Sequence, residues 1–328
     1  MEFIGTLING LSLGGVYAMI ALGYTMVYGI AKLLNFAHGD IIMVGGYLLF
    51  VFVGIVNNSI IALLITAVLC AIFGIVMEKL AYKPLRGASP LAVLITAIGV
   101  SYLLQSLAQI IFGTQTKFVT LFQNLGVINI GSLVIQVSTL ITLFSCIVIM
   151  AGLTLFIKFS KTGRAMIAVS EDRGASELMG INVNSIITIT FAIGSFLAAA
   201  ASFFYLLKNP QINPTLGSMP GIKAFTAAVI GGVGSIPGAM AGGVLLGIIE
   251  MFTAKVSFLT PYTEAIEFGI LILILLVRPS GLLGKKRREK VWWNKILFYK
   301  KNIIKVIKIK LKNSLKNINQ KNTLIMSQ

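Results

Sequence analysis

Residues 222–252 read IKAFTAAVIGGVGSIPGAMAGGVLLGIIEMF, an apolar run that is interrupted in its middle by GGVGSIPG at 231–238. Four glycines and a proline stand within this short segment, and they remove both helix propensity and a backbone donor. One continuous helix is therefore excluded. The run predicts two helical pieces that are joined by a break.

The composition indicates that the whole chain is a membrane protein. Of 328 residues, 57% are hydrophobic and only 11% are charged, whereas a soluble domain carries about 25% charged residues. The mean hydropathy is +0.93. Too few charges remain to cover a water-facing surface, so the sequence predicts an all-α polytopic membrane protein.

A spanning helix needs about 20 apolar residues, and eight hydrophobic regions approach this length. Seven of them are uninterrupted, and the broken run is the eighth. The seven cover residues 11–30, 41–56, 60–81, 91–112, 133–157, 185–207 and 265–277. We expect a transmembrane domain over 1–284, followed by a basic cytoplasmic tail over 285–328.

The basic residues between the spans predict the orientation. With the N-terminus outside and the C-terminus in the cytoplasm, nine basic residues lie inside and four outside, as the positive-inside rule favours. The inner residues are Lys32, Lys79, Lys83, Arg86, Lys158, Lys161, Arg164, Arg173 and Arg278, and the outer ones are Lys117, Lys208, Lys223 and Lys255. The run at 222–252 then has to enter the membrane from the outer side and return to that side, either as a re-entrant hairpin or as two short crossings.

Irregular backbone at membrane depth is tolerated only inside protein or beside a water-filled cavity, because lipid offers it no hydrogen-bond partner. The break is therefore a candidate for the translocation pathway or its gate. Its residues are Gly231, Gly232, Gly234, Ser235, Pro237 and Gly238. The alternative is a tight turn between packed helices, with the pairs Gly238/Gly242 and Gly243/Gly247 as small-residue contacts.

A second polar interruption separates the first two spans. It contains Asn35, Phe36, Asp40 and the single histidine of the chain, His38. Ionisable groups at membrane depth usually belong to a pathway, so these residues are also pathway or gate candidates. The alternative is a turn at the cytoplasmic side in which Asp40 caps the next helix.

The two interruptions are followed by similar sequences, Gly45-Gly46 and Gly242-Gly243, each before an apolar stretch. Paired broken segments in two halves of a chain are typical of transporters with inverted repeats. The similarity is short, and it suggests such a repeat.

The loop at 158–183 is the longest one on the predicted cytoplasmic side, and it contains a short helix. Ser170 would cap this helix, Glu171 and Asp172 would lie in its first turn, and Gly180 would close it. Ala175, Leu178 and Met179 would form an apolar face. Such a helix suits docking into a groove of a cytoplasmic partner, and the alternative is a connector that lies on the membrane.

Residues 285–328 contain fourteen of the 27 basic residues and one acid, Glu289. The net charge of +17 therefore reflects a tail and predicts no nucleic-acid partner. Apolar residues recur among the lysines at helical spacing, which predicts an interfacial helix on anionic membrane lipid. The alternative is a disordered extension.

No pattern in the sequence predicts catalysis, a cofactor or a metal. Cys70 and Cys146 lie in apolar runs, and residues 281–286 fail the spacing of a phosphate loop. Glu78 and Glu250 are the main ionisable residues of the predicted spans, and both lie near span ends. Because no catalytic set is present, we expect no enzyme activity in this chain. An ion-coupled carrier usually has acidic groups in the middle of its spans, so we expect that energy for transport comes from another chain.

Motifs spread over residues 1 to about 290 resemble the LivH-type permease subunits of branched-chain amino acid ABC importers. The matching stretches are GYTMVYGI at 23–30, NFAHGD at 35–40, GRA at 163–165, ED at 171–172, MGIN at 179–182, KAFTAAV at 223–229 with the glycine run after it, GI at 247–248 and RPSGLLG at 278–284. The chain continues from about Val291 beyond the usual end of the family.

The resemblance implies a subunit of the bacterial inner membrane that imports leucine, isoleucine and valine by ATP-driven alternating access. It implies a homologous LivM-like permease, two cytoplasmic ATP-binding subunits and an extracytoplasmic substrate-binding protein as partners. It also implies that the loop helix is the site of ATPase coupling. The coupling residues would be Arg164, Glu171, Asp172, Ala175, Leu178, Gly180 and Ile181.

Three alternatives stay open. Close relatives with much the same motifs import urea or short amides. An ion-coupled secondary carrier or a passive channel would need no ATPase, and a membrane scaffold would transport nothing.

Overall fold

The computed structural model describes residues 2–33, 35–122, 125–130 and 133–284. The predictions for the tail at 285–328 lie outside the described residues. In chain order the helices are α1 (Glu2–Ala31), α2 (His38–Val56), α3 (Ser59–Met77), the π-helix η1 (Glu78–Tyr82), the 3-10 helix η2 (Lys83–Leu85), α4 (Pro90–Phe112), α5 (Val137–Phe159), α6 (Lys161–Glu171), α7 (Arg173–Leu178), α8 (Val183–Lys208), α9 (Ser218–Gly231), α10 (Ile236–Lys255), the 3-10 helix η3 (Thr260–Tyr262) and α11 (Thr263–Val277).

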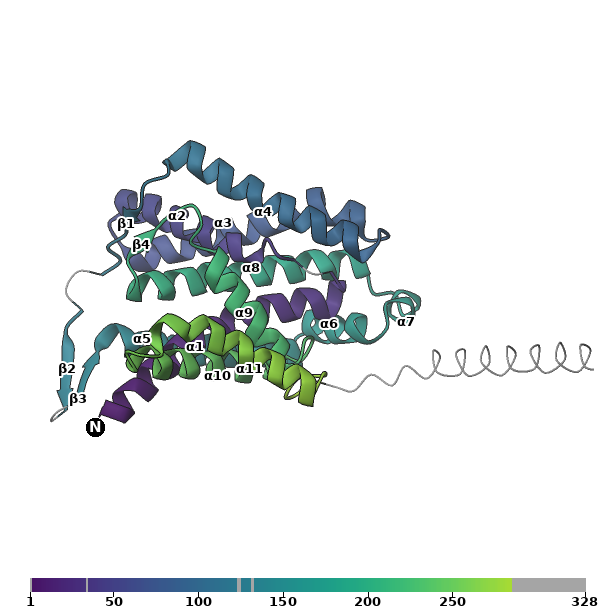
Figure 1. The fold of residues 1–328 in the computed structure, drawn as a ribbon. Helices are drawn as coiled ribbons and strands as arrows, with labels where there is room; N and C mark the ends of the chain where they lie inside the picture. Colours follow the sequence, from purple (N-terminus) through teal and green to yellow (C-terminus); the bar gives the residue numbers. More distant parts are fainter. Residues whose placement is uncertain (1, 34, 123–124, 131–132, 285–328) are drawn as a thin grey trace, which may run out of the picture. The chain divides into compact units, whose positions relative to one another are not determined.

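Four short strands lie at one end of the helical bundle (Figure 1). They are β1 (Lys117–Phe118), β2 (Val127–Ile130), β3 (Leu133–Gln136) and β4 (Gln211–Ile212). β1 pairs antiparallel with β4, and β2 pairs antiparallel with β3. We call this the hairpin end, and we call the opposite end, with α6 and α7, the loop end.

The structure confirms an all-α polytopic membrane protein. Eight helices of the described residues are long and apolar enough to span a membrane, and they include all seven uninterrupted predictions. Two predicted starts were wrong. α1 begins at Glu2 instead of residue 11, because its first turns also pack on α10, where Gly10 lies against Ile248 and the rings of Phe3 and Phe252 lie 5.1 Å apart. Residues 133–136 form β3, so α5 begins at Val137.

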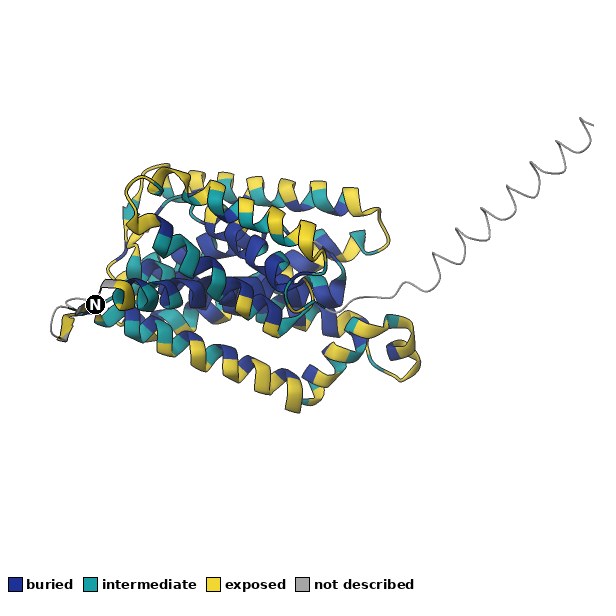
Figure 2. Cartoon of the chain, turned by 60° about the horizontal axis from the view of Figure 1, so that its bottom comes forward, coloured by how far each residue is buried: buried dark blue, intermediate teal, exposed yellow. Residues whose placement is uncertain are grey.

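α1 and α8 are the most buried of the spanning helices. Figure 2 shows that the buried residues gather in the middle of the bundle. The outer helices α4 and α11 instead expose large hydrophobic side chains, as lipid-facing helices do. α10 packs closely on two neighbours through small residues. Its Gly243 and Gly247 lie against α1, and its Gly238 and Gly242 lie against α9. The expected small-residue contacts are confirmed, and each pair serves a different helix.

The chain re-enters the bundle after α1. The imidazole of His38, the first residue of α2, lies directly against Gly23 of α1. Gly23 precedes the end of α1 at Ala31 by about two turns, or roughly 12 Å. α2 therefore starts inside the bundle instead of at the loop end.

α9 starts at a similar depth. Gly217 and Gly221, at its beginning, contact Gly39 of α2. With 14 residues α9 is about 21 Å long, too short for a hydrocarbon core of about 30 Å. The predicted interruption of 222–252 is confirmed as the segment between α9 and α10, which lies at the loop end, where Gly234 approaches Gly29. The run matches neither predicted topology fully, a re-entrant hairpin or two short crossings: α9 is a half-length helix that starts inside the bundle, and α10 is long enough to span the membrane.

Candidate functional site

The end of α1 is closed by two cations. Lys32 adopts a left-handed conformation with φ of 53°, and its N–H donates to the carbonyl of Tyr28 over 2.9 Å. Its ammonium donates to the carbonyl of Gly29. The guanidinium of Arg173 donates to the carbonyl of Ile30 over 2.9 Å. The last carbonyls of a helix have no partner within it, and positive charge is favourable there, so both cations stabilise the turn into the first break.

The first break, residues 32–37, is held by a side chain from another helix. The hydroxyl of Tyr82 in η1 donates to Oδ1 of Asn35 over 2.6 Å, and both residues are buried. Two further polar atoms, Nδ2 of Asn35 and Nε2 of His38, are buried without a hydrogen-bond partner among the described residues. Unpaired buried polar atoms are costly, so this segment has donor and acceptor capacity that this conformation does not use.

Asp40 is 2% exposed and lies in the first turn of α2. Its Oδ1 accepts a hydrogen bond from Nε2 of Gln105 over 2.9 Å. The same Gln105 amide donates over 3.3 Å to Ser218, at the start of α9. The alternative in which Asp40 caps α2 is wrong, because the N-cap residue is Ala37 and makes no side-chain bond. Asp40 instead links α2 to α4 and, through Gln105, to α9.

The second break, residues 232–235, is closed mainly by backbone contacts. Gly232 and Gly234 have φ of 109° and 91°, a region that favours glycine. The N–H groups of Leu282 and Leu283 donate to the carbonyls of Ile230 and Gly231 over 2.8 and 2.9 Å.

Side chains complete the turn only at the start of α10. The Ser235 hydroxyl caps α10 by accepting from the N–H of Gly238 over 3.2 Å, and Pro237 occupies the first turn of α10. Gly231 and Gly238 are packed so closely that a Cβ on either would overlap the backbone of the other. This geometry is a tight turn between packed helices.

The first break lies beside α9, the helix that leads into the second break. The ring of Phe36 in the first break lies 5.3 Å from the ring of Phe225 in α9. Phe225 also lies 5.9 Å from Tyr24 of α1. The candidate pathway residues predicted from two distant segments therefore border the same half-length helix.

The predicted coupling loop contains two helices, α6 and α7, and spans 160–182 because Lys158 belongs to α5 and Val183 starts α8. The predicted cap was wrong: Asp172, not Ser170, caps α7 by accepting from the N–H of Ala175 over 3.0 Å. Ser170 remains in α6 because the helix continues to Glu171.

The predicted closure of α7 at Gly180 is confirmed. Gly180 has φ of 80°, and its N–H donates to the carbonyl of Glu177. The N–H of Ile181 donates to the carbonyl of Ser176, which completes a Schellman motif. This turn presents Leu178 and Met179 to solvent, with 90% and 82% of their surface exposed.

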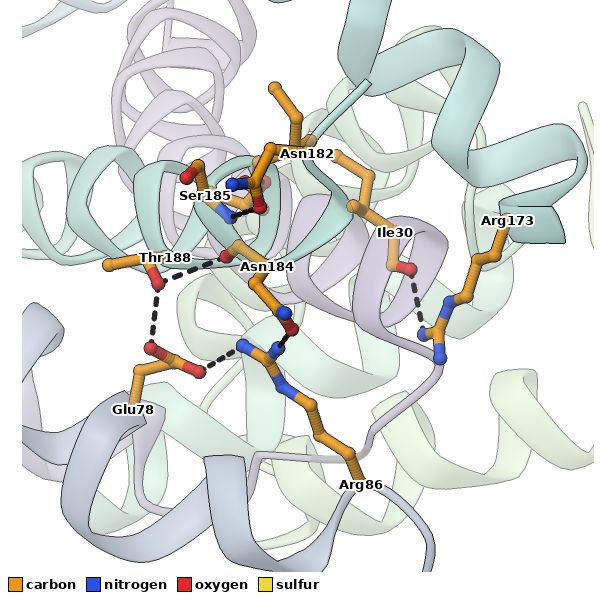
Figure 3. A network of polar contacts seen from close by, with 10 residues as sticks. Ile30, Glu78, Arg86, Arg173, Asn182, Asn184, Ser185 and Thr188 are labelled. Atoms are coloured by element: carbon orange, nitrogen blue, oxygen red, sulfur yellow. Dashed lines mark hydrogen bonds and ion pairs between the residues drawn. The ribbon is translucent and has the colours of Figure 1, made fainter. Parts of the chain in front are cut away.

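The remaining predicted coupling residues lie on the same loop. Arg164, Glu171 and Ala175 are exposed, and Ile181 is half-buried. Among the described residues, no hydrogen bond or ion pair joins any of these four to either break. Arg173 joins the loop to the last turn of α1, directly before the first break (Figure 3), and the sequence prediction did not include this residue among the coupling residues.

A cluster of ionisable groups was missed by sequence reasoning. Nζ of Lys223 in α9 lies 2.8 Å from a carboxylate oxygen of Glu250 in α10 and 3.4 Å from one of Glu267 in α11. Lys223 is 7% exposed and Glu267 is 1% exposed. The assignment of Lys223 to an outer loop was therefore wrong, because α9 carries it into the bundle. The sequence offered one signal for this burial: Lys223 lies within the apolar run at 222–252.

The described residues contain no group of three or more His, Cys, Asp or Glu side chains that could hold a metal ion. Cys70 and Cys146 are buried free thiols in separate helices. The polar groups of the breaks and of the loop can form hydrogen bonds and exchange their hydrogen-bond partners.

Comparison with known proteins connects this arrangement to one family. A family model described as "Branched-chain amino acid transport system / permease component" matches residues 6–275. The chain is 43% identical over 303 residues to the high-affinity branched-chain amino acid transport system permease protein BraD of Pseudomonas aeruginosa, with 88% of this chain and 98% of BraD covered. It is 40% identical over 305 residues to LivH of Escherichia coli K12, with 89% and 98% covered. It is 30% identical to the probable LivH of Methanocaldococcus jannaschii, with 81% and 88% covered.

Proposed function

The chain belongs to the branched-chain amino acid transport permease family, and from this premise we propose that it is the membrane-spanning subunit of an ATP-driven importer of leucine, isoleucine and valine. The near full-length similarity to BraD carries the proposal. These relatives are transport permeases and not enzymes. In this role the chain binds and moves its substrate and makes or breaks no covalent bond.

The partners that we propose are a LivM-like permease, two cytoplasmic ATP-binding subunits and an extracytoplasmic substrate-binding protein. The exposed apolar tip of α7, Leu178 and Met179, supports docking of an ATP-binding subunit at the loop end. A soluble face seldom exposes two adjacent large apolar side chains to this extent without a partner. The Schellman closure at Gly180 fixes the tip in a defined orientation, as docking requires.

The proposed orientation puts the loop end in the cytoplasm of a bacterial cell, with the protein in the inner membrane and the N-terminus outside. The loop end contains the basic residues of η1, η2, α6 and α7. Because Lys223 is buried in α9, three of the four basic residues first assigned to the outer side remain there, which strengthens the charge asymmetry.

In the proposed cycle the first break gates the pathway. Asn35, His38 and Asp40 lie inside the bundle, and each is held by neutral partners or has an unpaired polar atom. A rearrangement of side chains there can open a polar path without unfolding a helix. The second break would support this movement as a packed turn at the loop end.

The test is uptake into proteoliposomes that contain the full complex, with labelled leucine or labelled urea, with and without ATP. ATP-dependent leucine uptake is the expected result. ATP-dependent urea uptake would retain the importer and replace the substrate. Uptake of leucine without ATP would contradict the proposed mechanism and favour an ion-coupled carrier or a channel, and the absence of any uptake would favour a scaffold.

A further inference from the structure

α7 is connected to α1 through its first residue. Nη2 of Arg173 donates to the carbonyl of Ile30 over 2.9 Å (Figure 3). Ile30 lies in the last turn of α1, directly before the chain turns at Lys32. Arg173 is half-buried, and its charge lies at the negative end of the α1 dipole. A displacement of α7 therefore acts on the end of α1 through a charge-assisted hydrogen bond.

The other end of the loop is connected to the same region by a different route. Asn184, in the first turn of α8, accepts a hydrogen bond from Arg86, and Arg86 pairs with Glu78. Thr188 of α8 donates to the second oxygen of Glu78 over 2.8 Å (Figure 3). The side chain of Glu78 is fully buried, so breaking this pair would leave an uncompensated charge.

Glu78 is also the first residue of the π-helix η1, and Tyr82 is its last. Tyr82 donates to Asn35 in the first break over 2.6 Å. A single π-helical turn thus joins the ion pair at the start of α8 to the first break. Isolated π-helical turns are frequent at functional sites.

The two routes end at different residues, Ile30 and Asn35, and they differ in the number and burial of their contacts. The route through Glu78 is buried and doubly bonded, so it fixes Asn35 relative to α8. The route through Arg173 is a single contact to Ile30 from a loop helix with an exposed tip. If α7 shifts while α8 stays, the strain falls on the chain after Ile30, between the two attachments at Ile30 and Asn35.

We propose that Arg173 is the positioning residue through which movement of α7 reaches the first break. This inference rests on the proposed function, because it takes α7 as the docking site of an ATP-binding subunit. Arg173 sets the position of the α1 end, and the Glu78–Arg86–Asn184 contacts hold the other side of the break in place.

The first experiment needs no partner. Hydrogen exchange is measured on the full-length permease in lipid nanodiscs for Arg173→Gln, Arg173→Lys and the control Lys161→Gln, an exposed change on α6. Exchange at residues 30–40 is expected to rise about fivefold in Arg173→Gln, with exchange in α7 unchanged. Arg173→Lys keeps the charge and a donor, so it should stay near the wild type. Unchanged exchange at 30–40 in Arg173→Gln would overturn the proposal.

The second experiment uses the full complex in proteoliposomes with labelled leucine and ATP. Arg173→Gln is expected to lower the leucine transported per ATP hydrolysed about tenfold, with ATPase activity retained and partial rescue in Arg173→Lys. An unchanged ratio would overturn the proposal, and so would loss of the bound ATP-binding subunit, which would make Arg173 a docking residue. Absence of ATP-dependent leucine uptake in the wild type would instead overturn the proposed function, and the exchange experiment would still decide whether Arg173 positions the α1 end.

Discussion

The two breaks of this permease interrupt its helices by different chemistry. The first, residues 32–37, is polar and is held by side chains, chiefly the hydrogen bond from Tyr82 to Asn35. The second, residues 232–235, is rich in glycine and is closed by the backbone bonds from Leu282 and Leu283. One segment has polar atoms without partners, and the other is packed backbone against backbone.

In the proposed cycle, this difference separates the break that rearranges from the break that supports it. Side-chain hydrogen bonds exchange partners by rotation about single bonds, at little cost to the backbone. A backbone turn with two glycines at positive φ has less of this freedom, because Gly232 and the flanking carbonyls of Ile230 and Gly231 are already in backbone hydrogen bonds. Substitutions at the second break and its helix should therefore damage the fold, and substitutions at the first should damage transport more than the fold.

The largest effect on stability is expected from Lys223→Met in α9, the helix that leads into the second break. It leaves the carboxylates of Glu250 and Glu267 without their cation in a buried site, at a cost of about 3–5 kcal/mol of unfolding free energy. Denaturant or thermal unfolding in detergent measures it. The exposed Lys161→Met is the matched control. Recovery of stability in Lys223→Met combined with Glu267→Gln would attribute the loss to the carboxylates, and equal stability of the single variant and the wild type would contradict the ion cluster.

Gly231→Ala should have the next largest effect, about 3 kcal/mol, because the new Cβ overlaps the backbone of Gly238. The measurement is the same unfolding transition. Gly99→Ala in α4 is the control, since a Cβ there meets no atom within 4 Å. If both alanine variants unfold alike, the second break is not the close-packed turn described above.

Asn35→Ala should cost less, about 2 kcal/mol, because it leaves the buried Tyr82 hydroxyl without its acceptor. ATP-dependent leucine uptake should nevertheless fall strongly, because the first break loses the contact that orders it. A double-mutant cycle with Tyr82→Phe isolates the bond, and purely additive costs would show that it contributes nothing. Normal uptake in Asn35→Ala would remove the first break from the gating mechanism.

The smallest effect on the fold is expected from Gly180→Pro, about 1 kcal/mol or less, because the turn is exposed and lies outside the bundle. Proline cannot adopt φ of 80° and has no N–H to donate to Glu177, so the end of α7 should be lost and uptake uncoupled from ATP hydrolysis. Gly180→Asn, which tolerates the left-handed region, is the control. Coupled uptake in the proline variant would exclude the α7 tip as the docking site.

Local chemistry made several features predictable. The glycines and the proline at 231–238 located the second break, because their effect on the backbone does not depend on neighbours. Gly180 was recognisable as a helix end for the same reason. The Ser170 prediction failed because a serine at a helix end and a serine in the last turn of the preceding helix look alike in sequence, and Asp172 competed for the same role.

Depth and partners were not predictable in the same way. Lys223 is separated by 44 positions from Glu267, and nothing in the spacing shows that a half-length helix brings them together. The Arg173–Ile30 contact spans 143 positions and ends on a backbone carbonyl, which every residue possesses. No residue type signals such an acceptor.

The sequence by itself determined that this is an all-α membrane protein of the branched-chain amino acid permease family, where its helices break and where its loop helix ends. These properties follow from hydrophobicity, from backbone preference and from motifs, all of which are local to the chain. Only the tertiary structure decided that α2 and α9 begin inside the bundle, that Lys223 is paired with two carboxylates and that α7 is attached to α1. These facts depend on which helices pack side by side, and burial gives a charge or a carbonyl its importance only after that packing exists.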